Sequence, residues 1–477
     1  MSSPARLTAA ERVRRISGRI IQLPVPERRR QAPTARDHAL TFINAFVIIA
    51  VIGTILLALP WTTESGRRTG VPDALFAAVS AIAGSAAAVD TANHWNFAGE
   101  LVILLLIQAG GLGFMVGASI VLQALRRGPH SYSLRDTLMI RDGAPALSVG
   151  EAVNLSRRIL RFTVITELIG TVLLTIRFAD EMPLPNAIWH GLFYSVSAFC
   201  NAGLDLSGQF RSLTPYQSSI WINVVIIVLA QLGALSYIVV ADIAAGRRWR
   251  AFSFETKLIL SLNLFLIAAG AIAFLASEWN GAMAGISPGT KILASVFQSA
   301  SSRSVGFSTV DFSRVNDFTL VVFIGLMFLG GAPGSTAGGV KLATAGVVAI
   351  AVLATLRGRA EPQMFGRRVS TALVFRAMTV ITLMAMALFV ATLALVVTEE
   401  IFGDKQGFLD LLFEATSALG TVGLSAGVTP MLSTAGKLVL CAVLFFGKVG
   451  PLTVAYALQR RQQDVRYRFP EASVRIG

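Results

Sequence analysis

The sequence predicts an all-α polytopic membrane protein, in which eight transmembrane helices form four tandem repeats of helix, re-entrant pore loop and helix around one pore. Hydrophobic residues make up 54% of the 477 residues and charged residues only 14%, whereas about 25% of a typical soluble domain is charged. The mean hydropathy is +0.65. Long apolar runs alternate with short polar stretches, which indicates that lipid surrounds most of the chain.

Eight apolar segments are long enough to cross a bilayer, because about 20 residues suffice for one crossing. They lie at residues 39–59, 101–125, 159–178, 220–245, 258–276, 318–356, 372–397 and 437–458. An even number of crossings puts both termini on one side. Arginines cluster before the first segment, between segments and after the last, and this positive-inside pattern predicts a plasma-membrane protein with both termini cytoplasmic. Because its basic residues are dispersed in this way, the net charge of +14 does not indicate nucleic-acid binding.

A shorter apolar segment, too brief to cross, lies between the two spans of each predicted pair. These segments are residues 73–83, 187–200, 291–302 and 408–419. A stretch of small residues follows each one, and the stretches recur about every 100 to 120 residues. The recurrence predicts four repeats. Their boundaries are 38–127, 128–250, 251–368 and 369–460, between a basic N-terminal segment at 1–37 and a C-terminal tail at 461–477.

The small-residue stretches are candidates for a selectivity filter. Backbone that leaves a helix at membrane depth must be buried in protein or line a watery cavity. A half-length helix ends in unpaired carbonyls that attract a cation, and a following glycine lets further carbonyls face a shared axis. Close helix packing is the alternative reason for these small residues. The candidate residues are Gly84, Ser85 and Ala86; Asn201, Ala202 and Gly203; Ser304, Val305 and Gly306; and Thr421, Val422 and Gly423.

The sixth span contains a run that cannot remain a regular helix. Proline removes a backbone donor, and five glycines within ten residues lower the helix propensity. We expect a gate loop beside a cavity, and a simple proline kink is the alternative. The candidate gate residues are Gly330, Gly331, Pro333, Gly334, Ser335, Thr336, Gly338 and Gly339.

Several charged residues have positions that suggest a role in cation passage. Lys448 lies midway along the last span, too far from either end to reach water easily, and a charge at that depth is a candidate functional group. A purely structural pairing of this lysine is the alternative, and Lys341 near the gate run is more ambiguous. Asp90, Asp205 and Asp311 follow the first three loops, where they would raise the local cation concentration or serve as ordinary loop carboxylates.

The sequence shows no motif for a metal site or for enzyme catalysis. The two cysteines, Cys200 and Cys441, lie in apolar or loop segments and have no zinc-ligand spacing. The four histidines also lack metal spacing, and no Walker loop or catalytic Ser/His/Asp arrangement is visible. We therefore predict a protein that is not an enzyme and binds no organic cofactor.

Five strings in order resemble the Trk/Ktr/HKT superfamily of potassium transporters. They occupy residues 197–205, 298–309, 330–339, 415–424 and 447–453. Within the superfamily the chain is most similar to the Ktr-type membrane subunit, because about 38 polar and basic residues precede the first span and leave no room for the extra hairpin of the Trk type. The resemblance implies K⁺ transport through four filter loops, with the gate loop below the third loop and Lys448 below the filter.

The resemblance also implies a homodimer above a cytoplasmic KtrA-type nucleotide-binding regulatory ring. The first loop departs from the family pattern, since residues 82–90 are one residue shorter than usual, and either Gly84 or Ala86 occupies the filter position. A Na⁺ or mixed Na⁺/K⁺ transporter on the same scaffold is therefore one alternative. A second is an ion-coupled secondary transporter of a small solute, whose broken helices would meet at the midplane.

Overall fold

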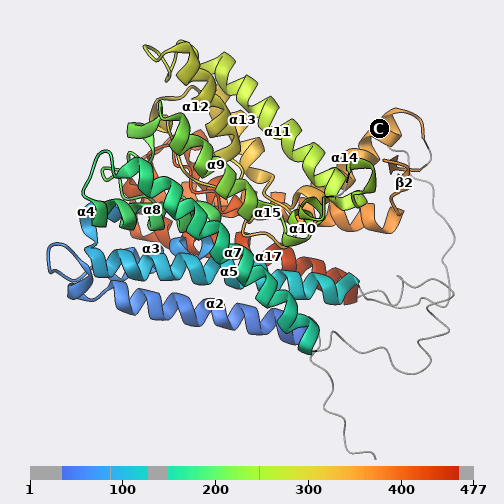
Figure 1. Ribbon diagram of the computed structural model, residues 1–477, viewed down its shortest axis with the longest axis horizontal. Helices are drawn as coiled ribbons and strands as arrows, with labels where there is room; N and C mark the ends of the chain where they lie inside the picture. The colour runs from blue at the N-terminus through green and yellow to red at the C-terminus, as the bar shows by residue number, and fades with distance from the viewer. Residues whose placement is uncertain (1–34, 86–87, 127–148, 247, 360, 461–477) are drawn as a thin grey trace, which may run out of the picture. The chain divides into compact units, whose positions relative to one another are not determined.

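A computed structural model describes residues 35–85, 88–126, 149–246, 248–359 and 361–460 (Figure 1). Almost all regular structure in these ranges is helical. Most of the predicted N-terminal segment, the C-terminal tail, the start of the linker before the second repeat and the candidate filter residue Ala86 lie outside the described residues.

Six long helices correspond to predicted spans. They are α2 (Ala35–Leu57), α5 (Phe97–Arg126), α7 (Val149–Phe178), α11 (Phe254–Glu278), α15 (Thr371–Phe402) and α17 (Thr434–Arg460). Within the described residues, α5, α7, α11 and α15 each contain a stretch long and apolar enough to cross a membrane. The bent pair α9 (Ile220–Ala234) and α10 (Tyr237–Ala244) is a fifth candidate.

The predicted fourth span is not one continuous helix. The axes of α9 and α10 differ by 110°, because the chain extends at Leu235 and Ser236 before a new helix begins. The hydroxyl of Ser236 accepts a hydrogen bond from the backbone NH of Val239 and caps α10. The predicted sixth span is also interrupted, between α13 (Asp317–Phe328) and α14 (Leu342–Leu356), where the sequence predicted a break.

The four half-length segments form helices close to their predicted bounds. These are α3 (Val71–Ala83), α8 (Leu184–Phe199), α12 (Pro288–Ser301) and α16 (Phe408–Gly420). Proline at the first or second position starts α3, α8 and α12, where its missing NH costs no helical hydrogen bond. The last turn of each helix is buried, so the terminal carbonyls lie inside the protein.

Short elements complete the connections. They are η1 (Pro60–Thr62), α4 (Thr91–His94), η3 (Thr214–Tyr216), η4 (Trp249–Ala251), η5 (Phe312–Arg314), η6 (Thr429–Met431) and an antiparallel hairpin of β1 (Gln363–Met364) and β2 (Arg367–Arg368).

Contacts between the helices close into a ring. Helix α5 packs on α7 and α8, α9 packs on α12, α13 packs on α16, and α17 returns to pack on α3. The last long helix therefore contacts the first half-length helix, although more than 350 residues separate them in the chain. This closure brings the four half-length helices around one interior region.

Glycines in α5, α9 and α17 permit close packing against the ends of three half-length helices. A methyl group at Gly110, Gly233 or Gly447 would lie 2.0, 1.8 or 2.2 Å from the carbonyl oxygen of Ile82, Phe199 or Leu419, respectively. These distances leave no room for any side chain. The shared contact also shows that Ile82, Phe199 and Leu419 occupy corresponding positions.

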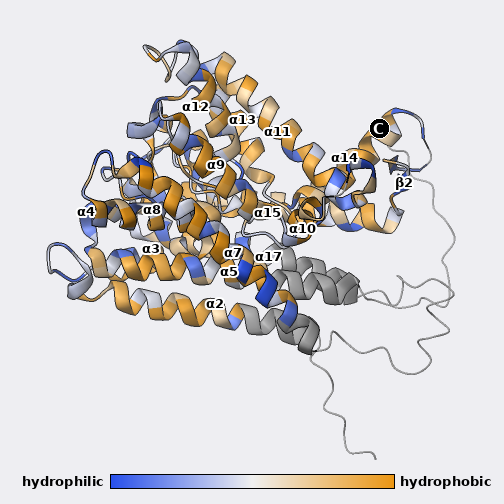
Figure 2. Ribbon diagram, viewed as in Figure 1, coloured by the Kyte–Doolittle hydropathy of each residue, from blue (hydrophilic) through white to orange (hydrophobic). Residues whose placement is uncertain are grey.

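The outer faces of the helices are apolar, as lipid contact requires (Figure 2). On α2, Val47, Ile48 and Ile55 are each about half exposed. Helix α11 exposes Phe265, and α15 exposes Phe389. The described helices therefore bury one face against each other and present the other to an apolar environment.

The packing of Gly447 predicts a steric effect on stability. Gly447→Ala should lower the free energy of unfolding by about 1–3 kcal/mol, because its methyl group would overlap the Leu419 carbonyl oxygen. Thermal unfolding of the detergent-solubilised protein measures the change. Gly325→Ala is the matched control, since no atom lies within 4 Å of the added methyl group. Equal midpoints for the two variants would contradict this packing.

Candidate ion-conduction site

Four glycines after the half-length helices adopt left-handed backbone conformations. The φ angles of Gly84, Gly203, Gly306 and Gly423 are 76°, 68°, 86° and 100°. This region costs an L side chain about 1–2 kcal/mol, so glycine suits it. The carbonyls on either side are thereby turned out of the helical direction.

The loops that carry these glycines lie against one another. A methyl group on Gly203 would lie 2.7 Å from the Cα of Gly306, and one on Gly306 would lie 3.2 Å from the Cα of Gly423. A methyl group on Gly84 would lie 2.3 Å from the carbonyl oxygen of Asn201. The structure thus brings together the candidate filter residues that it describes in all four loops.

The glycine of the first loop does not correspond to the other three. Counting two residues from the matched carbonyls of Ile82, Phe199 and Leu419 leads to Gly84, Asn201 and Thr421. Asn201 and Thr421 also have positive φ, at 54° and 48°. In the second and fourth loops, Gly203 and Gly423 lie two residues after Asn201 and Thr421. The residue two positions after Gly84 in the first loop is residue 86.

A serine near the end of each half-length helix braces the loop that follows. The hydroxyl of Ser80 donates to the carbonyl of Ser85 at 2.9 Å, and that of Ser197 donates to Leu204 at 2.7 Å. Ser301 makes the corresponding bond in the third loop. In the fourth loop, Ser417 accepts from the NH of Gly423 at 3.1 Å. Each loop is therefore tied back to its own helix.

The segment between α13 and α14 lies against the loops of several repeats. The side-chain amide of Asn201 lies 2.6 Å from the Thr336 hydroxyl. The NH of Gly338 donates to Ser304 Oγ at 3.2 Å, and Ser304 in turn donates to the Thr421 carbonyl at 3.1 Å. The candidate gate segment thus contacts the second and third loops directly and approaches the fourth.

Lys448 links this segment to the first repeat. Its ammonium group donates to the carbonyl of Ala83, the last residue of α3, at 2.9 Å and to the carbonyl of Thr336 at 2.6 Å. Lys448 is buried, as its place in the sequence predicted. The ammonium of Lys341 donates to the carbonyls of Ala337 and Gly338, which associates this lysine with the same segment.

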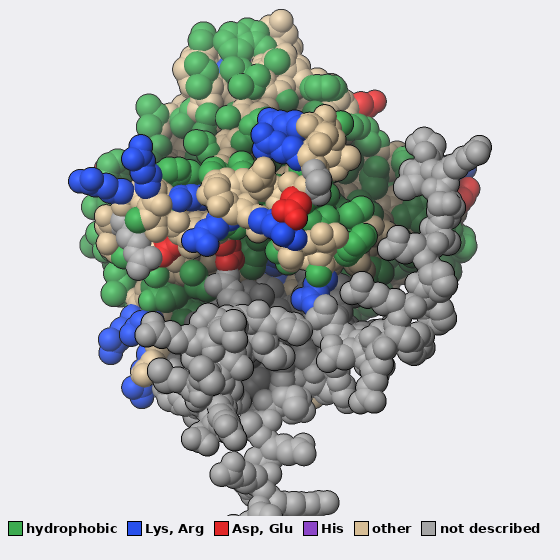
Figure 3. Space-filling view, turned by 90° about the vertical axis from the view of Figure 1, so that its right-hand side faces the viewer, with side chains coloured by type: hydrophobic (Ala, Val, Ile, Leu, Met, Phe, Trp, Pro, Cys, Tyr) green, Lys and Arg blue, Asp and Glu red, His purple; other side chains and the backbone are tan. Residues whose placement is uncertain are grey.

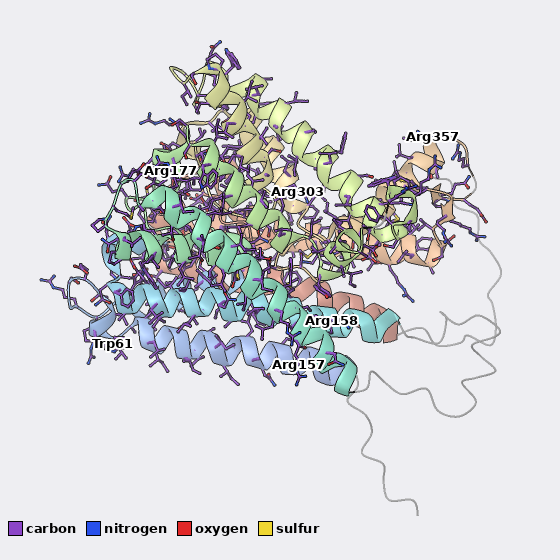
Figure 4. The ribbon with its side chains drawn as sticks, viewed as in Figure 1. Trp61, Arg157, Arg158, Arg177, Arg303 and Arg357 are labelled. Carbon is purple, nitrogen blue, oxygen red and sulfur yellow. The ribbon has the colours of Figure 1, made fainter. Side chains whose placement is uncertain are left out.

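Another buried cation, Arg303, was not among the sequence candidates. Arg303 lies in the interior of the bundle (Figure 4) and is 1% exposed. Its guanidinium donates to the side chain and backbone carbonyl of Asn263 and, at 3.2 Å, to the carbonyl of Gly330. An arginine directly before the third loop was the available signal, but sequence alone did not indicate its burial.

A cavity of about 370 Å³ opens on the other side of the loops. Gly203, Gly306 and Gly423 line it, together with Asp205 and Asp311. Two of the three predicted vestibule carboxylates therefore line this space. Asp90 instead binds the backbone NH of Gln209 and the side chain of Asn93, so it joins the first and second outer loops.

Glu414 supports the fourth outer loop from within α16. Its carboxylate accepts hydrogen bonds from the hydroxyls of Ser425 and Thr429 and from the NH of Ala426 at 3.1 Å. Among the described residues, no group of three or more His, Cys, Asp or Glu side chains is arranged to hold a metal ion.

Comparison with known proteins identifies the family. A family model described as TrkH, cation transport protein, matches residues 20–465. The chain belongs to this family. It is 35% identical to the potassium/sodium uptake protein NtpJ of Enterococcus hirae over 91% of the chain and 95% of that protein. It is 33% identical to the Ktr system potassium uptake protein B of Bacillus subtilis, with the same coverage.

The fold agrees with the family. The potassium transporter TrkH from Vibrio parahaemolyticus superposes with a TM-score of 0.68 at 18% identity, over 91% of this chain and 86% of that one. The protein is therefore an all-α membrane protein that transports cations and is not an enzyme. The predicted resemblance to the superfamily is confirmed.

The partly buried carboxyl of Asp205 predicts that cation uptake depends on pH. The pKa of Asp205 is raised to about 6, mainly by burial; the hydrogen bond from the Ser207 NH lowers it and the nearby charge of Asp90 adds to the rise. The carboxyl is therefore charged above pH 6 and neutral below it. Uptake from dilute cation should fall roughly two-fold or more between pH 7 and pH 5 as the cavity loses negative charge.

Asp205→Asn should remove this part of the pH profile and lower uptake at pH 7. Uptake by intact cells or proteoliposomes at several external pH values measures both effects. Asp180→Asn serves as a control, because Asp180 is exposed and paired with Arg177. A profile for Asp205→Asn that matches the unmodified protein would remove Asp205 from the cation path.

Proposed function

We propose that this protein is the membrane subunit of a potassium uptake system and conducts K⁺ through a filter of backbone carbonyls. The observation that carries the proposal is the meeting of four loops, each bearing left-handed residues at the end of a buried half-length helix. Carbonyl oxygens held in such rings replace the hydration shell of an alkali ion. The ion is the transported substrate, and no organic cofactor is required.

The half-length helices add an electrostatic contribution. The carboxyl end of a helix carries about half a negative charge. The C-termini of α3, α8, α12 and α16 lie directly before the loops, so all four favour a cation in the space that the loops enclose. Asp205 and Asp311 on the outer cavity add to this field.

The segment from Gly330 to Gly339 is proposed as the gate. Its contacts with Asn201, Ser304 and Lys448, none of which lines the outer cavity, support this proposal. Non-helical backbone at this depth is tolerated only where protein or water satisfies it. In this position the segment obstructs the inner end of the filter, and its displacement would open a path.

The proposed chain topology has eight crossings in four repeats, with the boundaries given by the sequence, in the plasma membrane. Lys and Arg side chains gather on the face turned to the viewer in Figure 3. Arg157, Arg158 and Arg357 lie toward that end, opposite Trp61 (Figure 4). Arg177 lies toward the same end of the view as Trp61, but Asp180 and Glu181 offset its charge. This asymmetry supports cytoplasmic termini.

The proposed assembly is a homodimer above a cytoplasmic KtrA-type nucleotide-binding ring. The relatives named as Ktr system potassium uptake proteins B and D are 31–33% identical to this chain, and the word system implies a partner subunit. The basic face in Figure 3 supports a cytoplasmic partner at that end.

Sodium or mixed transport is the second candidate. The relative named a potassium/sodium uptake protein is 35% identical to this chain. The register of the first loop also favours this candidate, because residue 86, which corresponds to Gly203 and Gly423, is alanine. Alanine in a left-handed conformation costs about 1 kcal/mol more than glycine, so one quarter of the filter would be less well formed.

Uptake by a cell that lacks its own potassium transporters tests the main proposal. Gly306→Ala should reduce K⁺ uptake at least about ten-fold, because the methyl group would lie 2.4 Å from the Val422 carbonyl oxygen and φ is 86°. Gly289→Ala is the control, since no atom lies within 4 Å of its methyl group. Normal uptake by Gly306→Ala at an equal membrane level would refute the filter.

The alanine in the first loop leads to a prediction about the preference for K⁺ over Na⁺. Ala86→Gly should raise the preference for K⁺ over Na⁺ by roughly five-fold, which corresponds to removing about 1 kcal/mol of backbone strain. Competitive uptake of the two ions measures the ratio. Ala87→Gly is the matched control, because residue 87 corresponds to Leu204 and Leu424 and not to the filter glycines. An unchanged ratio in Ala86→Gly would show that residue 86 does not complete the ring.

A further inference from the structure

One loop differs from the others at the position directly before its first left-handed residue. In the first, second and fourth loops this position holds Ala83, Cys200 and Gly420. The third loop has Arg303 there, and its repeat is the one whose second span is interrupted by the proposed gate. A long cationic side chain thus occurs where the other three repeats have a small one.

The guanidinium of Arg303 connects three parts of the protein. Its Nη1 atom donates to the side-chain and backbone oxygens of Asn263 on α11, and its Nη2 atom donates to the Gly330 carbonyl at 3.2 Å. Asn263 is itself held, because its amide donates to Gln231 Oε1 on α9 at 2.9 Å. Asn263 therefore fixes the Nη1 atom of the guanidinium, while the Nη2 atom binds the proposed gate segment.

Gly330 lies at the neck of the proposed gate. Its NH donates to the carbonyl of Val340 at 2.9 Å, and the Val340 NH donates to the carbonyl of Phe328 at 3.2 Å. These two bonds join the segment's entry to its exit. A bond to the Gly330 carbonyl consequently holds both ends of the segment at once.

The charge of Arg303 is compensated only by neutral acceptors in the described part of the chain, where no carboxylate lies within ion-pair distance of it. Burying a charge is costly unless it is hydrogen-bonded. Each hydrogen bond to an oxygen therefore offsets part of the cost of burying the charge. The guanidinium stabilises the arrangement in which the Gly330 carbonyl faces it. Hydrogen bonds to charged groups are among the stronger ones in proteins.

We propose that Arg303 is a positioning residue that clamps the neck of the gate segment to the third loop and stabilises the closed arrangement. This inference rests on the proposed function of the segment as a gate. Displacing the segment requires the Gly330 carbonyl to leave the guanidinium. The clamp consequently sets how often the gate opens without affecting the carbonyls that select the ion.

Uptake measurements on Arg303→Gln test the clamp. Loss of one charged hydrogen bond should shift the gate equilibrium toward opening by roughly ten-fold, so K⁺ uptake in the absence of regulatory subunits should rise several-fold. The K⁺ to Na⁺ preference should stay unchanged. Arg303→Lys should give a smaller rise, because a single ammonium cannot reach both acceptors in the geometry of the fork. Full restoration by lysine would overturn the clamp.

Asn263→Ala provides a second variant that retains the arginine. It removes the side-chain acceptor that fixes the guanidinium, so uptake should again rise. Unchanged uptake by Asn263→Ala, or by Arg303→Gln at a normal membrane level, would overturn the proposal. A fall in uptake together with altered ion preference would also overturn it, because Arg303 would then position the filter. Arg177→Gln at the outer end of α7 is the control and should behave as the unmodified protein.

Deletion of residues 334–337 separates this inference from the proposed function. If the segment is a gate, its deletion raises uptake, and adding Arg303→Gln to the deletion gives no further rise. If the deletion has no effect, the gate itself is refuted. If the deletion raises uptake but Arg303→Gln alone does not, the gate stands and only the clamp is refuted.

Discussion

The main constraint on this structure is that backbone NH and carbonyl groups outside the helices need hydrogen-bond partners within the protein, because lipid provides none. The chain leaves its helices at membrane depth in several places, and each exposed carbonyl or NH needs an internal partner or an ion. Serines near the ends of the half-length helices bond part of each loop. Buried cations bond much of the segment between α13 and α14. The carbonyls left between the loops are the ones suited to a transported ion.

The four loops differ in sequence, and the proposed function gives their repeats different roles. The first loop has glycine where the second and fourth have Asn201 and Thr421, and alanine where they have glycine. The third repeat carries both the proposed gate segment and Arg303, and the fourth supplies Lys448. A ring of four similar units can hold an ion symmetrically, but a gate needs only one movable element. Under the proposed function, a gate confined to one repeat leaves the other three free to hold the proposed filter rigid.

Features with a local cause were predictable from sequence. The half-length helices begin at proline or after a cap and end near glycine, so their bounds were predicted closely. The break at Leu235 and Ser236 was not predicted, because the residues before and after it are apolar and a single capping serine is a weak signal. The burial of Arg303 depends on Asn263 and Gly330, which are distant in the chain. No local pattern reveals such a contact.

Three cations tethered to the proposed gate segment raise the question of how an ion would pass them. Arg303, Lys341 and Lys448 donate to carbonyls of Gly330, Ala337 and Thr336 in one segment. These oxygens would otherwise attract a permeating ion and hold it below the filter. With their lone pairs occupied by protein cations, the closed segment offers an ion neither coordination nor a favourable field. If the segment is the gate proposed above, its opening separates it from these cations, so that one movement removes both the steric and the electrostatic obstacle.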